Sequence, residues 1–223
     1  MKVRLTLLLS LSITLCLSSG TRADDLGLDF TGGSSATAIQ DQTLGWEFSL
    51  SSTQTVTALG MFDIGSNGLN SPHLVGIWTT TGTLLGSVTV NNGSTPITST
   101  STAGRWLFQS LGSPLSLSPG NYVLGVDYSD TTDQVTTGAG SVTMATGLTF
   151  VQGRFVNNTT PGFDFPDATF STSGGHFGPD LLLTAVPEPT TWALIGIGLI
   201  GSGAYAWRKK RLAIKAGMAK LTV

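Results

Sequence analysis

Charged residues are scarce in this sequence, and positive charge is scarcest in its middle. Only 11% of the 223 residues are Asp, Glu, Lys or Arg. Residues 24–186 contain two cations, Arg105 and Arg154, against twelve acidic residues, which makes a formal charge of −10. A surface of that sign repels nucleic acid and anionic lipid, so we expect no nucleic-acid partner.

Cysteine is nearly absent as well. The only one, Cys16, lies in an apolar N-terminal run. The rest of the chain therefore contains neither a disulfide nor a thiol nucleophile. A domain in that part must be stabilised by its hydrophobic core and by backbone hydrogen bonds.

Long helix-forming runs are missing from the middle of the chain. The sequence has 29 Gly residues, and Ser and Thr occur in nearly every segment, a composition that favours short strands and turns. Alternation places Trp46, Phe48 and Leu50 on one face of a strand, and Thr80-Thr81-Gly82 indicates a hairpin turn. Strand-like runs cover residues 45–50, 55–62, 73–79, 83–90, 105–110, 122–128, 147–156 and 177–184.

The number and spacing of these runs predict the fold class. Eight or so short strands separated by turn residues are typical of an all-β domain with two packed antiparallel sheets. No repeat of 20 to 50 residues is visible. We therefore predict a β-sandwich ectodomain, of jelly-roll or Ig-like type, over residues 24–185.

The N-terminus has the order of a secretory signal peptide. Lys2 and Arg4 precede the apolar run 5–17, and the small residue Ala23 precedes the acidic Asp24. This order predicts a signal peptide over residues 1–23 that is cleaved between Ala23 and Asp24. The alternative is an uncleaved N-terminal membrane anchor.

The C-terminal segment has the pattern of a membrane-spanning helix. Residues 192–207 contain no charge, and at 1.5 Å per residue they extend roughly 24 Å, somewhat less than a hydrocarbon core of about 30 Å. We predict a transmembrane helix over 190–207, completed by flanking residues. The basic cluster Arg208, Lys209, Lys210 and Arg211 stops transfer and holds residues 212–223 in the cytoplasm, so the ectodomain lies outside.

A proline-rich motif, Val186, Pro187, Glu188 and Pro189, precedes this span. Each proline fixes its own φ and biases the residue before it toward an extended conformation. An extended peptide suits the groove of a processing enzyme. The alternative is that the motif only stiffens the linker before a membrane anchor.

The ordered motif, apolar helix and basic cluster of residues 186–211 resemble a PEP-CTERM sorting signal. This resemblance implies recognition and cleavage near Pro187-Glu188-Pro189 by an exosortase, a polytopic transpeptidase of the inner membrane. It also implies a Gram-negative bacterium that makes extracellular polysaccharide, which is a further candidate partner. The processed protein is then expected in the cell envelope, at the cell surface or in the extracellular matrix.

Residues 45–128 resemble, more weakly, an uncharacterised β-domain family of bacterial surface proteins. The resemblance lies in TVTALGMFD, GLNSPHLVGIWTTTGTLLGSVTV, RWLFQSL and LSLSPGNYVLGV. It implies a fold and no known activity.

The sequence offers little for catalysis. His73 and His176 are far apart, and neither an HExxH motif nor a nucleophile elbow occurs. Asp164 and Asp167 form a possible glycosidase pair, but aspartates in loops are usually solvated turn formers. We expect a non-catalytic protein without a cofactor, with a secreted hydrolase as a remaining alternative.

Calcium binding is a second alternative. Asp127, Asp130 and Asp133 put hard oxygen ligands into one loop, although their spacing is not that of an EF-hand. The simpler interpretation of this loop is a solvated acidic turn, with at most weak calcium affinity.

Carbohydrate binding is the alternative that the tryptophans raise. Trp46, Trp78 and Trp106 have aromatic faces on which sugar rings could stack, but each lies in an apolar strand pattern that favours core packing. Our leading prediction is therefore a non-catalytic envelope or matrix protein, followed by a carbohydrate- or calcium-binding adhesion module.

Overall fold

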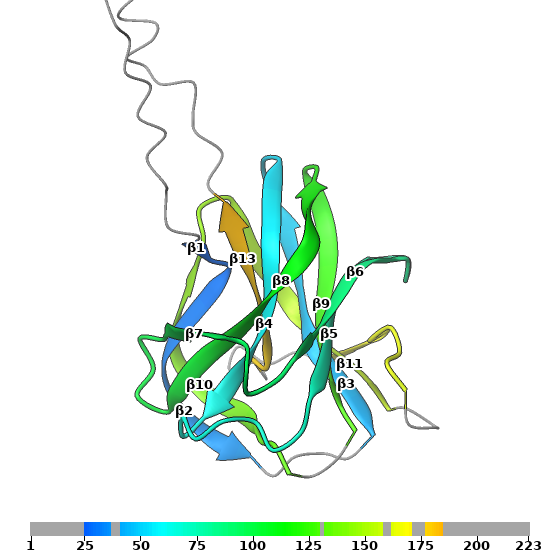
Figure 1. The fold of residues 1–223 in the computed structure, drawn as a ribbon. Helices are drawn as coiled ribbons and strands as arrows, with labels where there is room; N and C mark the ends of the chain where they lie inside the picture. Colours follow the sequence, from blue (N-terminus) through cyan, green and yellow to red (C-terminus); the bar gives the residue numbers. More distant parts are fainter. Residues whose placement is uncertain (1–24, 37–40, 130–131, 158–161, 171–176, 185–223) are drawn as a thin grey trace, which may run out of the picture.

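The fold is built of antiparallel strands. A computed structural model describes residues 25–36, 41–129, 132–157, 162–170 and 177–184 (Figure 1). These residues form thirteen strands and no helix: β1 Asp25–Leu26, β2 Leu28–Ala36, β3 Gln42–Leu50, β4 Gln54–Ile64, β5 His73–Thr79, β6 Leu84–Val90, β7 Thr95–Thr98, β8 Gly104–Leu117, β9 Gly120–Tyr128, β10 Val135–Met144, β11 Leu148–Asn157, β12 Ala168–Phe170 and β13 Pro179–Thr184.

The strands are arranged in two large sheets and one small one. One sheet has the order β1-β13-β4-β8-β7, and the other has the order β12-β11-β3-β9-β5-β6. Strands β2 and β10 pair only with each other. All pairings between these strands are antiparallel. The prediction of an all-β fold is confirmed, and the arrangement is consistent with a β-sandwich.

Each predicted run overlaps a strand, but the short strands β1, β7 and β12 and the strand pair of β2 with β10 were not predicted. Strands β2 and β10 look like turn-rich segments in the sequence, because Gly32, Gly33 and Gly138 interrupt their alternation. These glycines have positive φ values of 68°, 95° and 66°. Glycine adopts such angles without strain, so it bends the ribbon while pairing continues on either side.

The unpredicted strand β2 places a large aromatic ring in the core. The Phe30 ring is fully buried, and its centroid lies 4.8 Å from that of Phe62 and 5.9 Å from that of Trp106. Phe177 extends the cluster, at 6.0 Å from Phe30. Packing of this ring, rather than strand propensity, keeps the glycine-rich ribbon against the five-stranded sheet.

Asp29, beside Phe30, supplies the polar contacts that Trp106 needs inside the core. Its carboxylate accepts hydrogen bonds from Trp106 Nε1 at 3.2 Å, from Ser99 Oγ at 2.5 Å and from the Thr100 amide at 2.8 Å. Burial raises the pKa of this carboxyl, but the bonds from Ser99, Thr100 and Trp106 outweigh burial and lower it overall. The charged form of Asp29 is therefore part of the folded structure.

A row of glycines crosses the six-stranded sheet. Gly45 of β3 pairs with Gly125 of β9, which pairs with Gly76 of β5. The row lets the segment before β12 approach the sheet, because a Cβ atom on Gly76 would lie 2.6 Å from Phe163 Cζ and one on Gly125 would lie 3.3 Å from Pro166 Cγ. This face of the sheet is therefore covered by its own chain.

The most crowded position of the row gives a test of this packing. A Cβ atom on Gly45 would lie 1.8 Å from the Leu124 carbonyl oxygen, which is backbone and cannot rotate away. We expect Gly45→Ala to destabilise the protein by about 1–3 kcal/mol or more in urea unfolding. Gly112→Ala is the matched control, because no atom lies within 4 Å of its Cβ position. Equal stability of the two variants would contradict this account.

A buried carboxyl group, Asp180, lies at the start of β13. It is 0% exposed, its Oδ1 accepts a hydrogen bond from the Leu28 amide at 2.9 Å, and its Oδ2 has no hydrogen-bond partner among the described residues. Burial raises the pKa of Asp180 well above its ordinary value. The folded state therefore favours the neutral acid.

The raised pKa of Asp180 makes the stability of the folded protein depend on pH, in a direction that can be predicted. A raised folded-state pKa means that the contribution of neutral Asp180 to stability is fully present below the unfolded pKa and is lost as pH rises through the folded pKa. We expect Asp180→Asn, which cannot ionise, to gain in stability relative to the parent protein as pH rises from acid to neutral. Thermal unfolding followed by circular dichroism across that range measures the difference. Parallel stability curves would show that Asp180 does not titrate in this way.

Candidate functional site

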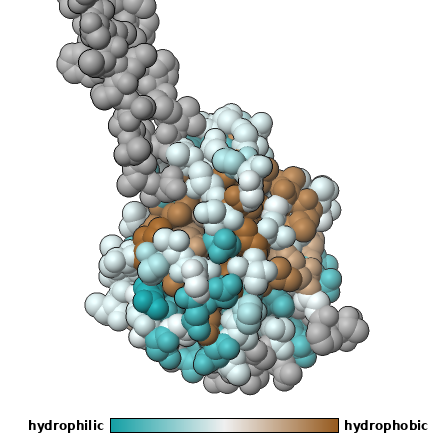
Figure 2. Space-filling view, viewed as in Figure 1, coloured by the Kyte–Doolittle hydropathy of each residue, from teal (hydrophilic) through white to brown (hydrophobic). Residues whose placement is uncertain are grey.

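A polar pocket lies at the end of the domain where β4 leads into β5 and β9 leads into β10. Its volume is about 200 Å³. Hydrophilic residues gather on the lower half of the visible face, which is the end that carries these connections (Figure 2). The lining residues are Phe62, Asp63, Ile64, Asn67, Leu69, Asn70, Thr132, Asp133 and Gln134.

The β4–β5 loop forms one wall, and side chains from outside it hold its backbone. The Asp63 carboxylate accepts a hydrogen bond from the Gly68 amide at 3.1 Å. Asn92, in the turn between β6 and β7, makes a reciprocal pair with Leu69: its Oδ1 accepts from the Leu69 amide at 2.6 Å, and its Nδ2 donates to the Leu69 carbonyl at 2.7 Å. The loop is thus tied to two other parts of the chain.

Asp133 fixes the next two residues of the same loop. Its carboxylate accepts hydrogen bonds from the Asn70 amide at 3.0 Å, from the Ser71 amide at 3.1 Å and from Asn70 Nδ2 at 3.1 Å. Backbone amides 68 to 71 are therefore all satisfied by side-chain oxygens. A loop without regular structure is made rigid in this way, which preorganises the pocket wall.

His73, the first residue of β5, completes the contacts of Asp133. The imidazole is 1% exposed, with Nδ1 at 2.7 Å from the Asp127 carbonyl and Nε2 at 2.9 Å from Asp133 Oδ2. Ser71 Oγ is a longer contact of Nε2, at 3.3 Å. A carbonyl and a carboxylate only accept, so a ring protonated on both nitrogens would satisfy both contacts. His73 and Asp133 are thus a buried, hydrogen-bonded pair, which is an ion pair when the ring is protonated.

The pKa of Asp133 agrees with this pairing. Burial raises the pKa of the carboxyl, but hydrogen bonds from His73, Asn70 and Ser71, together with the charge of His73, outweigh burial and hold it below its ordinary value. Across the pocket, Arg105 Nε lies 2.9 Å from Asp63 Oδ2. Each pocket carboxylate therefore has its own cation.

The structure assigns other partners to the predicted calcium ligands that it describes. Asp133 points inward to His73, and Asp127 contributes its backbone carbonyl to the same ring. Asp130 lies outside the described residues. Within the described part of the chain, no group of three or more His, Cys, Asp or Glu side chains is arranged to hold a metal ion. Weak calcium binding by this loop stays a prediction.

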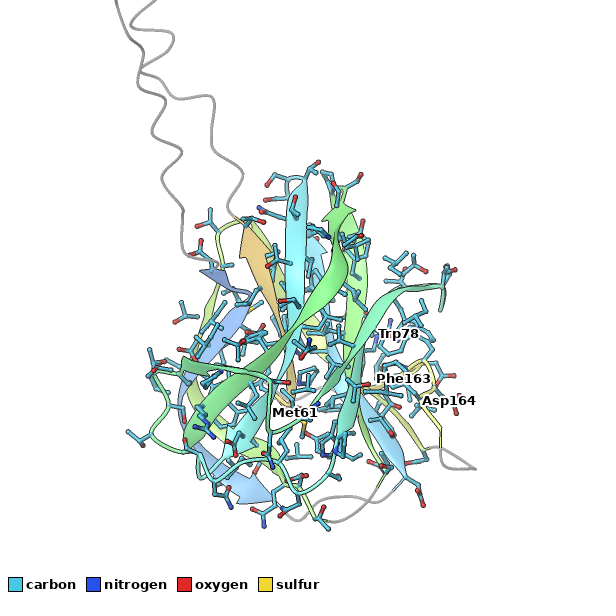
Figure 3. All side chains as sticks on the ribbon, in the orientation of Figure 1. Met61, Trp78, Phe163 and Asp164 are labelled. Atoms are coloured by element: carbon cyan, nitrogen blue, oxygen red, sulfur yellow. The ribbon has the colours of Figure 1, made fainter. Side chains whose placement is uncertain are left out.

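The three tryptophans considered for sugar stacking are buried. Trp46 and Trp106 are 1% and 0% exposed and lie in the core, where Trp46 Nε1 donates to the Pro179 carbonyl at 2.8 Å. Trp78 is 3% exposed and lies apart from the core, with its ring centroid 4.8 Å from that of Phe163 (Figure 3). None of the three offers an open face.

The aspartates considered as a glycosidase pair belong to this covering segment. Asp164 and Asp167 are both exposed. The Asp167 carbonyl accepts a hydrogen bond from Arg154 Nη1 at 2.9 Å, while Arg154 Nη2 pairs with Glu47 Oε2 at 2.8 Å. This segment is thus anchored to the sheet through Arg154. The other candidate catalytic residue, His176, lies outside the described residues.

The sequence did not indicate the pocket as a site. Residues 65–70 are rich in Gly and Asn, which indicates a loop, but the contacts that close it come from Asn92 and Asp133. These are 23 and 63 residues away from Leu69 and Asn70. The only local signal is the Asp63 carboxylate directly before a run of Gly and Asn. That pattern is too common to identify a site.

Fold and pocket together define a small antiparallel β-domain with a rigid, polar loop end. Residues 185–211 match the family model of the PEP-CTERM protein-sorting motif. The chain therefore carries this motif, which supports export and sorting by an exosortase. No curated protein and no solved structure matches the chain.

The residues expected to direct sorting and export lie outside the described residues. They are Val186, Pro187, Glu188, Pro189, Arg208, Lys209, Lys210, Arg211, Ala23 and Asp24. The predicted signal peptide and transmembrane helix fall in the same undescribed parts. Among the residues that the structure describes, no helix has the length and hydrophobicity of a membrane span.

Asp133→Asn tests the importance of the buried ion pair. Removing one partner of such a pair leaves the other uncompensated, so we expect a loss of about 3–5 kcal/mol in unfolding free energy and faster amide exchange at Asn70 and Ser71. A lowered folded-state pKa means stability that is present above the unfolded pKa and lost as pH falls through the folded pKa. The variant should therefore lose less stability on acidification than the parent.

Asp164→Asn is the control, because it removes the same charge from an exposed position. It should change stability by no more than about 0.5 kcal/mol. If Asp133→Asn were as mild as this control, the ion pair would not hold the loop end together.

Proposed function

We propose that this chain is a non-catalytic protein of the cell envelope or extracellular matrix, anchored first in the inner membrane and then processed by an exosortase. The observation that carries the proposal is the PEP-CTERM motif at residues 185–211. It is supported by the sequence order of Pro-Glu-Pro, apolar segment and basic cluster, which would first halt the chain and then present an extended peptide for cleavage.

The contacts and exposure of the candidate catalytic side chains support a non-catalytic ectodomain. Both ring nitrogens of His73 are engaged with acceptors, and the ring is buried. A general base needs a free nitrogen within reach of a substrate proton. Asp164 and Asp167 are exposed carboxyls in the segment that covers the sheet, whereas the two carboxyls of a glycosidase flank the scissile bond of a bound sugar.

Processing is tested by changing the proline motif. We expect Pro187→Ala combined with Pro189→Ala to free the backbone that the enzyme grips in extended form, so that most of the protein accumulates unprocessed in the inner membrane. The measurement is the mass and the envelope fraction of the protein, in a host with the exosortase and in one without it. An intact tail through Val223 in both hosts would make the C-terminal segment a permanent anchor.

Changing the basic cluster should cause a different defect from that of the proline variant. Replacing Arg208, Lys209, Lys210 and Arg211 with Ser removes the charges that hold the C-terminus inside, so retention or orientation should fail before processing. Protease accessibility of the C-terminus in spheroplasts distinguishes this defect from the cleavage defect of the proline variant.

A further inference from the structure

We propose that the loop-end pocket binds a neutral, hydroxyl-rich ligand of the size of one sugar ring, such as the end of an uncharged glycan chain. This proposal rests on the proposed function in one respect only: the domain must lie outside the inner membrane, where such a ligand is present. The chemical class of the ligand is inferred from the charge balance, the free amides and the rigidity of the pocket.

The charge balance of the pocket excludes charged ligands. Asp63 is paired with Arg105, and Asp133 is paired with His73, so the two buried carboxylates contribute little net field to the space between them. A divalent cation needs carboxylate oxygens that are free to coordinate it. The Asp133 oxygens already accept bonds from Asn70, Ser71 and His73. An anionic ligand is repelled by the formal charge of −10 over residues 24–186.

Free amide groups at the rim of the pocket suit hydroxyl groups. Asn67 and Gln134 both line the pocket, both are exposed, and neither side chain has a hydrogen bond to any other described residue. A carboxamide presents an oxygen acceptor and two N–H donors. A hydroxyl group both donates and accepts, so two such amides can each bind a ligand hydroxyl without leaving a charge unpaired.

The size and rigidity of the pocket further narrow the range of ligands that it can bind. A volume of about 200 Å³ is below the range of about 300–1,000 Å³ that is usual for drug-sized ligands, so it accommodates a single ring. The surface that the pocket presents is mainly polar, because Phe62 and Leu69 in its lining are almost completely buried. Because Asp63, Asn92 and Asp133 already hold the loop, little ordering entropy remains to be lost on binding.

The experiment uses the full chain, purified in detergent, in binding titrations with maltohexaose, cellohexaose and mannohexaose. Oligogalacturonate is the anionic counterpart and calcium chloride the cationic one. We expect binding of at least one neutral oligosaccharide and none of oligogalacturonate or calcium at this pocket. Asn67→Ala and Gln134→Ala should each weaken that binding about fivefold, the value of one ordinary hydrogen bond.

Gln109→Ala is the matched control, because Gln109 is an exposed amide on β8 outside the pocket. It should leave the affinity unchanged, and thermal unfolding should show all three variants to be folded. The proposal is overturned if no neutral probe binds, if the pocket variants bind as well as the control, or if oligogalacturonate or calcium binding is lost in Asn67→Ala. Sorting is measured by tail processing, so either proposal can fail while the other stands.

Discussion

The loop end of this protein depends on one buried ion pair, that of His73 with Asp133. The imidazole bridges the β9 backbone and the β9–β10 connection, and the carboxylate in turn holds two backbone amides of the β4–β5 loop. Three segments far apart in the sequence meet at these two side chains. Because both are buried, loss of either charge leaves the other without compensation, so the whole end of the domain is sensitive to it.

The two arginines of the ectodomain, Arg105 and Arg154, are also paired with buried acids. Arg105 pairs with Asp63 and Arg154 pairs with Glu47, and each acid is almost completely buried. Asp180 is buried without a cation, and its raised pKa shows the alternative, which is to remain neutral. Asp29 is a third case, a buried carboxylate that hydrogen bonds rather than a cation keep charged. The two carboxylates at the loop-end pocket, by contrast, each have a basic partner. This balance is what makes the loop-end pocket suitable for an uncharged ligand.

Glycine has two structural roles that composition alone does not separate. In β2 and β10 it allows positive φ and bends a strand pair around the aromatic core. In the row Gly45, Gly125 and Gly76 it removes side chains so that another segment can lie against the sheet. The first role made two strands look like turns in the sequence, and the second has no local signal in the sequence. Both arise from contacts with distant residues.

The sequence by itself determined the fold class, most of the strands and the sorting motif. The alternation along 45–50 and the apolar run 73–79 are local properties, and the motif at 185–211 is a linear signal. Only the tertiary structure decided that Phe163 packs on Trp78, which partners Asp133 has, and that the pocket exists. The physical reason is sequence separation: His73 and Asp133 are 60 residues apart, and Leu69 and Asn92 are 23 apart. No local pattern encodes such contacts, because they form only when the sheets bring the loops to the same end.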